Sequence, residues 1–178
     1  MCSLKIISHS EKETANLGTR LVHLLGPGDI VCLFGPLGAG KTILVKGMAR
    51  GLGISKDQVI SPSFVLIREY PSMNRQARGV RRGKTSITLY HLDLFRLKKI
   101  REILDLGYEE YFYRQGICVI EWAQRLAGFL PSEFLKIELR NSNKTKRVIR
   151  FVAKGKRYRK ILQRLQTNKF LSNLKLPK

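Results

Sequence analysis

The sequence is poor in acidic residues. It has 13 Asp and Glu against 34 Lys and Arg over 178 residues, which gives a formal net charge of +21. No acidic residue follows Glu138, whereas fourteen Lys or Arg do. Such an excess of positive charge favours encounters with nucleic acids or acidic proteins, but it does not define a fold.

Cysteine is scarce, and its spacing excludes two kinds of site. Cys2, Cys32 and Cys118 form no C-x-x-C pair, so neither a zinc knuckle nor a dithiol redox motif is indicated. Cys32 and Cys118 lie in apolar runs and are expected to be small buried side chains. Because no apolar run is long enough for a membrane span and the amino terminus lacks a signal-peptide core, we expect a soluble cytoplasmic protein with no membrane partner.

Apolar patterns predict strands and helices in a chain of one-domain length. A buried strand is expected at 29–34 and a helix at 41–53. The segment 59–70 is predicted to form a Ser-Pro-Ser turn and then a strand, and the segments 87–95 and 116–122 are predicted as strands. Residues 97–112 are predicted as a helix broken at Gly107. The alternating segments 133–140 and 147–153 are interpreted as an antiparallel hairpin or neighbouring strands.

The segment "GPLGAGKT", residues 35–42, fits the pattern G-x-x-x-x-G-K-[ST] between a predicted strand and a predicted helix. Its glycines let the backbone curl so that amides face phosphate oxygens, and the helix start adds a favourable dipole end. Lys41 would reach the β- and γ-phosphates, and the Thr42 hydroxyl would bind Mg²⁺. The alternative is a glycine turn before a helix. The loop by itself leaves the reaction open.

Two carboxylates end predicted strands downstream. Glu121 follows four apolar residues, and Asp93 lies in "LYHLDLF". Ligands of α/β sheets bind at the carboxyl ends of strands, where such acids can hold Mg²⁺ or orient a water. For Asp93 the alternative is a helix cap or turn residue. Ser63, in "SPSF", lies where nucleotide switch loops occur, although a plain loop is equally consistent with this turn.

Five segments occur in an order that resembles the TsaE (YjeE) family, the P-loop ATPases of tRNA threonylcarbamoyladenosine biosynthesis: "GPLGAGKT", "SPSF", "YHLDLFRL", "LGYEEYF" and "VIEWAQRL". The resemblance covers about residues 10–153. It implies an α/β P-loop NTPase fold, a three-layer sandwich with a central mixed sheet. It also implies that the protein binds ATP and Mg²⁺ and hydrolyses ATP, and that a TsaB–TsaD complex stimulates the hydrolysis. The hydrolysis would help that complex attach a threonylcarbamoyl group to the adenosine next to the anticodon, in tRNAs reading codons that begin with A.

The resemblance also implies the site residues. Glu121, Asp93 and Lys41 would be catalytic, and Thr42, Glu121 and Asp93 would hold the metal. The nucleotide would be bound by Gly35, Leu37, Gly38, Ala39, Gly40, Lys41, Thr42, Ile43, Ser63, Glu11 and Arg147. The chain departs from the family at Pro36, where an acidic residue is usual, and at Ile43, which replaces a common second threonine.

Two readings compete with the ATPase interpretation. A small-molecule kinase on the same fold would need a lid, but the basic loop 71–86 lies too early in the chain and lacks acidic partners for a substrate. A nucleic-acid-binding protein with a vestigial P-loop is disfavoured by the intact Lys41, Thr42 and Glu121.

Two basic segments lie outside the resemblance. We expect an ATPase domain at 1–153 with a flexible loop insertion at 71–86, and a basic tail at 154–178 that could form an amphipathic helix. Both segments could contact tRNA or an acidic face of a partner protein. Without such a contact, tRNA would be a substrate of the partner complex and only an indirect substrate of this protein. The alternative is a solvated basic surface. Few aromatic residues accompany the charges, so base stacking is not indicated.

Overall fold

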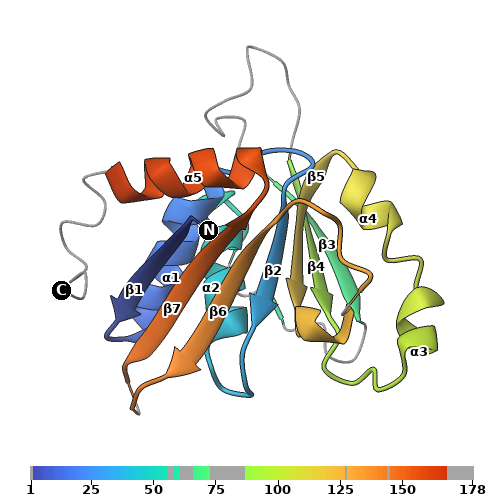
Figure 1. Cartoon of the computed structure of the whole chain (residues 1–178), viewed down its shortest axis with the longest axis horizontal. Coiled ribbons are helices and arrows are strands. Elements are labelled where there is room, and N and C mark those ends of the chain that lie inside the picture. Colours follow the sequence, from blue (N-terminus) through green and yellow to red (C-terminus); the bar gives the residue numbers. More distant parts are fainter. Residues whose placement is uncertain are drawn as a thin grey trace.

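A seven-stranded mixed sheet forms the centre of this computed structural model, which describes residues 2–55, 58–60, 66–72, 87–126, 128–143 and 145–167 (Figure 1). In spatial order the strands are β1 (Ser3–Ser8), β7 (Arg147–Lys154), β6 (Phe134–Asn141), β2 (Ile30–Phe34), β5 (Gly116–Glu121), β4 (Thr88–Asp93) and β3 (Ile67–Pro71). The inner strand β2 pairs in parallel with β5 and β6, and β4 pairs in parallel with β5. The other pairs are antiparallel, including the predicted pair β6–β7.

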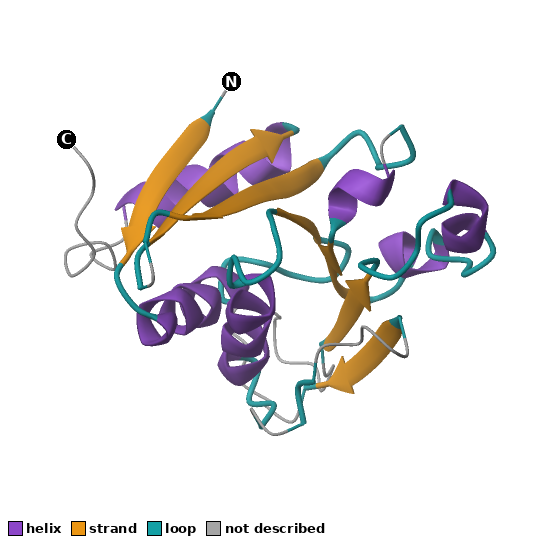
Figure 2. Cartoon of the chain, turned by 90° about the horizontal axis from the view of Figure 1, so that it is seen from below, coloured by secondary structure: helices purple, strands orange, loops and turns teal. Residues whose placement is uncertain are grey.

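Helices cover the sheet on both faces, which gives the predicted α/β fold (Figures 1 and 2). One face carries α1 (Glu11–Val22) and α2 (Lys41–Gly51). The other carries α3 (Ile100–Leu104), α4 (Glu110–Tyr113) and the 3₁₀ helix η1 (Ala123–Leu126). Finally, α5 (Lys156–Thr167) lies across one end of the sheet. No helix in the described ranges is long and apolar enough to span a bilayer.

The central strand β2 is buried on both faces, which explains its continuous apolar sequence. Val31 and Leu33 pack into the core that contains α1 and α2. Ile30 and Cys32 point the other way, into the core that contains α3, α4 and η1, together with Cys118 of β5. Burial raises the pKa of both thiols. The two cysteines are therefore small core side chains, as predicted.

The amino-terminal elements β1 and α1 are not among the predicted ones. The sequence of α1 is mostly polar, and Ser10 caps it by accepting a hydrogen bond from the Glu13 amide at 3.1 Å. The helix packs closely on α2, because a Cβ on Gly47 would lie 2.0 Å from the carbonyl oxygen of Ala15. Close backbone approach at glycine, rather than a wide apolar stripe, lets α1 join the core.

The described part of the basic tail is anchored to the start of β2. Arg157 of α5 donates two hydrogen bonds to the fully buried carboxylate of Asp29, the one from Nη2 at 2.6 Å. The neighbouring Tyr158 hydroxyl accepts a 2.7 Å hydrogen bond from the Ile30 amide. Four side chains of α5 pack into the same core as α1 and α2: Tyr158, Ile161, Leu162 and Leu165. The helix is therefore fixed to the sheet and presents its remaining face to solvent.

We predict that Arg157→Ala lowers the free energy of unfolding by about 2 kcal/mol, because the buried Asp29 carboxylate loses its charged donors and keeps the Gly26 amide. Urea denaturation would measure the change. Arg159→Ala is the matched control, since Arg159 is an exposed arginine of the same helix. We expect it to change stability by less than about 0.5 kcal/mol. Equal losses in the two variants would contradict the anchoring role of Arg157.

Candidate functional site

The glycine-rich loop connects the end of β2 to the start of α2, as the sequence predicts. Gly35 has a φ of 146°, and a Cβ there would lie 2.3 Å from the carbonyl oxygen of Leu139 on β6. Gly40 has a φ of 96° and precedes the first residue of α2. In the described structure no side chain caps α2, so its first-turn amides are available to an anionic ligand.

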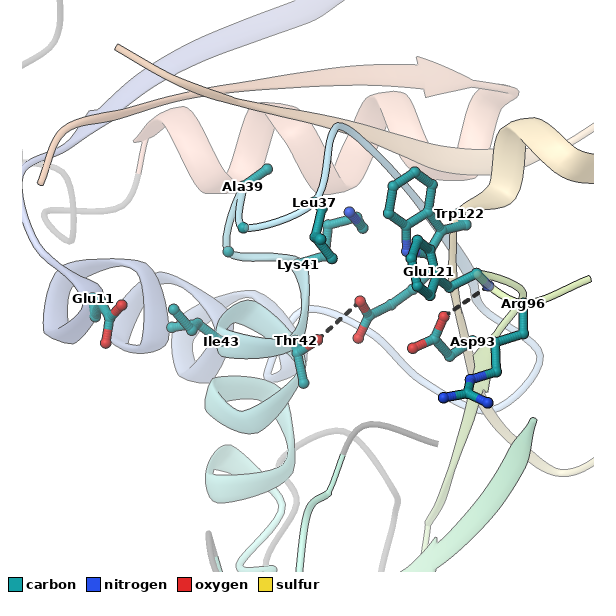
Figure 3. Close-up of a pocket in the computed structure, with 13 residues that line it drawn as sticks. Glu11, Leu37, Ala39, Lys41, Thr42, Ile43, Asp93, Arg96, Glu121 and Trp122 are labelled. Atoms are coloured by element: carbon teal, nitrogen blue, oxygen red, sulfur yellow. Dashed lines mark hydrogen bonds between the residues drawn. The ribbon is translucent and has the colours of Figure 1, made fainter. Parts of the chain in front are cut away.

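The Lys41 side chain folds back over this loop. Its Nζ donates hydrogen bonds to the carbonyl oxygens of Gly35 at 2.9 Å and Pro36 at 2.8 Å, and lies 3.9 Å from the centre of the Trp122 ring (Figure 3). Burial lowers the pKa of Lys41, while Glu121 and Asp93 act in the opposite direction. Pro36 thus holds the Lys41 side chain through its carbonyl group, and this contact does not need the backbone N–H that proline lacks.

Glu121 and Asp93 meet at the carboxyl ends of β5 and β4, where they are direct partners in the strand register. Both residues are only 2% exposed. The Thr42 hydroxyl donates a 3.0 Å hydrogen bond to Glu121 Oε2 (Figure 3). Asp93 Oδ1 accepts a 3.0 Å hydrogen bond from the Phe95 amide. Asp93 therefore makes a turn contact of the kind considered as its alternative role, and it also lines the same pocket as Glu121.

His91 is a component that the sequence reasoning missed. Its Nε2 lies 2.9 Å from Glu121 Oε1, and the residue is fully buried. The sequence did contain a signal, because His91 and Asp93 are two residues apart on one strand and so share a face. Without the pairing of β4 with β5, nothing in the sequence connects His91 to Glu121.

Glu11 and Arg147 come from distant parts of the chain and contact each other beside the loop. Arg147 Nη2 donates to Glu11 Oε1 at 3.3 Å, and Nη1 donates to the Thr145 carbonyl at 3.2 Å. Arg147 is 6% exposed, and its Nε would lie 2.8 Å from a Cβ on Gly40. Glu11 therefore lines the pocket, and Arg147 supports it from behind Gly40.

Most of the predicted site residues line one pocket (Figure 3). Gly35 and Arg147 lie directly behind its wall, and Ser63 falls outside the described residues. The sequence reasoning did not include three of the lining side chains: Phe95, Arg96 and Trp122. The Phe95 and Trp122 rings pack 5.0 Å apart between centres and form an aromatic side of the pocket. The predicted lining residues are Glu11, Leu37, Gly38, Ala39, Gly40, Lys41, Thr42, Ile43, Asp93 and Glu121.

The donor set fits a magnesium–nucleotide complex. Hydroxyl and carboxylate oxygens are the ligands that Mg²⁺ prefers, and Thr42, Glu121 and Asp93 supply them within one pocket. The Lys41 ammonium and the uncapped start of α2 provide positive charge for phosphates beside them. The site can therefore hold phosphates and a divalent cation together.

Comparison with known proteins agrees with this geometry. The sequence profile described as "Threonylcarbamoyl adenosine biosynthesis protein TsaE" matches residues 8–149. The chain belongs to the TsaE family. The family is involved in the biosynthesis of threonylcarbamoyladenosine in tRNA, and its P-loop fold is the one seen in this structure.

Individual relatives cover most of the chain. The tRNA threonylcarbamoyladenosine biosynthesis protein TsaE of Bacillus subtilis is 38% identical over 173 residues, which is 97% of this chain and 100% of that protein. The protein of the same name from Treponema pallidum is 40% identical over 137 residues, covering 77% of this chain and 91% of its own. The crystal structure of YdiB from Bacillus subtilis superposes with a TM-score of 0.73 at 35% identity, covering 93% of this chain and 95% of YdiB.

We predict that Gly40→Ala lowers the free energy of unfolding by roughly 2 kcal/mol, because alanine is strained at this φ and its methyl group would press on Arg147. Gly128→Ala is the matched control, with a φ of 85° and, among the described residues other than its chain neighbours, no atom within 4 Å of the added Cβ. It should lose only about 1 kcal/mol. Urea denaturation compares them, and a loss in Gly40→Ala no larger than in the control would contradict the crowding against Arg147.

Proposed function

We propose that this protein binds and hydrolyses ATP with Mg²⁺, and that the hydrolysis supports a TsaB–TsaD complex in the threonylcarbamoyl modification of tRNA. The convergence of Lys41, Thr42 and Glu121 at one end of the sheet carries this proposal. In this proposal the partner pair performs the threonylcarbamoyl transfer, and this protein is not itself the transferase.

Each residue in the site has a distinct role in this proposal. Lys41 would exchange its two hydrogen bonds to loop carbonyl groups for contacts with phosphate oxygens. Because its side chain is already held at the loop, little conformational entropy would be lost on binding. Thr42 would turn its hydroxyl from Glu121 to the metal. Glu121, with Asp93 beside it, would orient the attacking water and accept its proton. When bound, Mg²⁺ would neutralise charge that develops on the phosphate oxygens.

A small-molecule kinase is the main alternative on this fold. It would need a phosphate acceptor in place of water and a lid that covers it. Within the described residues, the side chains that line the pocket beyond the loop include Asp93, Phe95, Arg96, Glu121 and Trp122. The lid candidate, the loop 71–86, lies outside the described residues from 73 onward. The two readings are therefore separated by a turnover assay.

We predict slow ATP turnover by the protein alone and a marked increase when TsaB and TsaD are added. A coupled assay for ADP release would measure both rates. The kinase alternative predicts that turnover depends on a small acceptor rather than on the protein pair. Stimulation by free RNA without the pair would contradict the proposal.

Two variants separate binding from chemistry. We expect Lys41→Ala to weaken nucleotide binding at least about tenfold, because it removes a charged phosphate donor. Glu121→Gln should keep the nucleotide affinity but lower the turnover at least about 100-fold, because an amide cannot accept the proton of water. Calorimetry and the ADP assay would report the two quantities. Normal turnover in Glu121→Gln would exclude the role assigned to Glu121.

We propose in addition that the exposed face of α5 contacts RNA phosphates. The helix contains no acidic residue. Arg157 pairs with Asp29, but the other basic side chains form no ion pair among the described residues: Lys156, Arg159, Lys160 and Arg164. Since α5 is anchored at the start of β2 and the phosphate loop follows its end, this face is separate from the nucleotide site. A row of exposed basic side chains on a helix that is fixed to the core fits a phosphate backbone.

We predict that the triple variant Arg159→Glu, Lys160→Glu, Arg164→Glu weakens tRNA binding at least tenfold at physiological salt, by about 1.4 kcal/mol or more. The slope of log affinity against log salt should also fall in magnitude by about 2 to 3. Fluorescence anisotropy with labelled tRNA would measure both.

The control is the triple charge reversal Lys98→Glu, Lys99→Glu, Arg101→Glu, which changes exposed side chains at the other side of the molecule (Figure 1). This variant should bind tRNA within about twofold of the unchanged protein, as expected for surface residues outside the contact. If both triple variants lose affinity equally, binding follows net charge alone. If the α5 variant loses affinity for TsaB–TsaD but not for tRNA, the basic face contacts an acidic protein.

A further inference from the structure

His91 and Thr42 hold the two oxygens of the Glu121 carboxylate from opposite sides. His91 Nε2 lies 2.9 Å from Oε1, and the Thr42 hydroxyl lies 3.0 Å from Oε2. Thr42 lines the pocket, whereas His91 does not. The carboxylate therefore has one oxygen directed into the site and one directed into the protein.

If the Glu121 carboxyl group is ionised, the contact with His91 requires a proton on Nε2. Glu121 Oε1 is an acceptor, so an unprotonated Nε2 would place two lone pairs against each other in a fully buried position. The other ring nitrogen, Nδ1, has no hydrogen-bond partner within the described ranges. A buried N–H without an acceptor is costly, so the ring places its donor where the acceptor is, at Glu121. The hydrogen bond thus has a defined direction, from His91 to Glu121.

We propose that His91 is a positioning residue, which fixes Glu121 so that Oε2, and not Oε1, is the oxygen that acts in the nucleotide site. This inference rests on the proposed ATPase function. When the Thr42 hydroxyl turns away to the metal, Glu121 loses one of its two side-chain partners and keeps the other. His91 then prevents the carboxylate from rotating, so that its free oxygen stays aimed at the site. Catalytic groups need such support, because small misplacements cost large factors in rate.

The surroundings of His91 are those of a fully buried residue on an inner strand. His91 lies on the inner strand β4 between Arg68 of β3 and Val119 of β5 in the strand register. The Tyr70 ring lies 6.4 Å from the His91 ring between centres. An apolar residue at this buried position would leave Oε1 without this partner. A hydrogen-bond donor at this position is therefore better explained by Glu121 than by core packing.

The test compares His91→Leu and His91→Gln in ATP hydrolysis with the TsaB–TsaD pair. His91→Leu should lower kcat about 10- to 100-fold with KM and ADP affinity changed less than about threefold, as is typical when a supporting hydrogen bond is lost. His91→Gln can still donate an N–H and should recover part of kcat. Leu89→Val is the matched control on the same strand and face, since it loosens the core without touching Glu121. Its kcat should stay within about twofold of the unchanged protein.

A spectroscopic measurement tests the contact without any turnover. Nitrogen-15 NMR of the histidine rings in the full chain should show His91 with a proton on Nε2, and Glu121→Ala should shift that resonance. An unprotonated Nε2, or a His91→Leu variant with unchanged kcat, would overturn the inference. Lack of turnover in the unchanged protein would instead overturn the proposed ATPase function, and the NMR result would still decide whether His91 holds Glu121.

Discussion

The parallel pairing of β2 with β5 is the constraint on which the site depends. It places Leu33, near the end of the strand before the phosphate loop, beside Glu121. From there the Glu121 carboxylate reaches the Thr42 hydroxyl at the start of α2. Residues 79 positions apart in the chain become hydrogen-bonded because two strands end together. That alignment of strand ends brings the glycine-rich loop, Thr42 and Glu121 together at one edge of the sheet.

The polar side chains of the site are buried, and burial makes an unpaired polar group costly. Lys41, His91, Asp93 and Glu121 are all at most 4% exposed, so each needs a partner within the protein or from a ligand. Lys41 uses loop carbonyls, and Glu121 uses Thr42 and His91. These contacts preorganise the site and also define what a bound nucleotide would replace. The same reasoning explains why Pro36 is compatible with the loop, since Lys41 contacts its carbonyl group.

The large positive charge has two different structural settings. Arg147 and Lys41 are buried at the candidate site and contact specific oxygens. The basic residues of α5 are exposed on a helix whose other face is fixed to the core, and Arg157 alone of them contacts a buried acid. Composition cannot separate these settings, because both contribute equally to a net charge of +21. Only the position of each side chain shows which charges serve the site and which face solvent.

The sequence by itself determined the phosphate loop, the buried strand before it and the acids that end two later strands. These are local features, since glycine spacing and apolar runs act on neighbouring residues. Tertiary structure alone decided the rest: that α1 joins the core through close backbone contact at Gly47, that Glu11 reaches Arg147, and that His91 holds Glu121. Each of these contacts joins residues that are far apart in the chain. Such contacts depend on strand order and helix packing, which local sequence patterns do not specify.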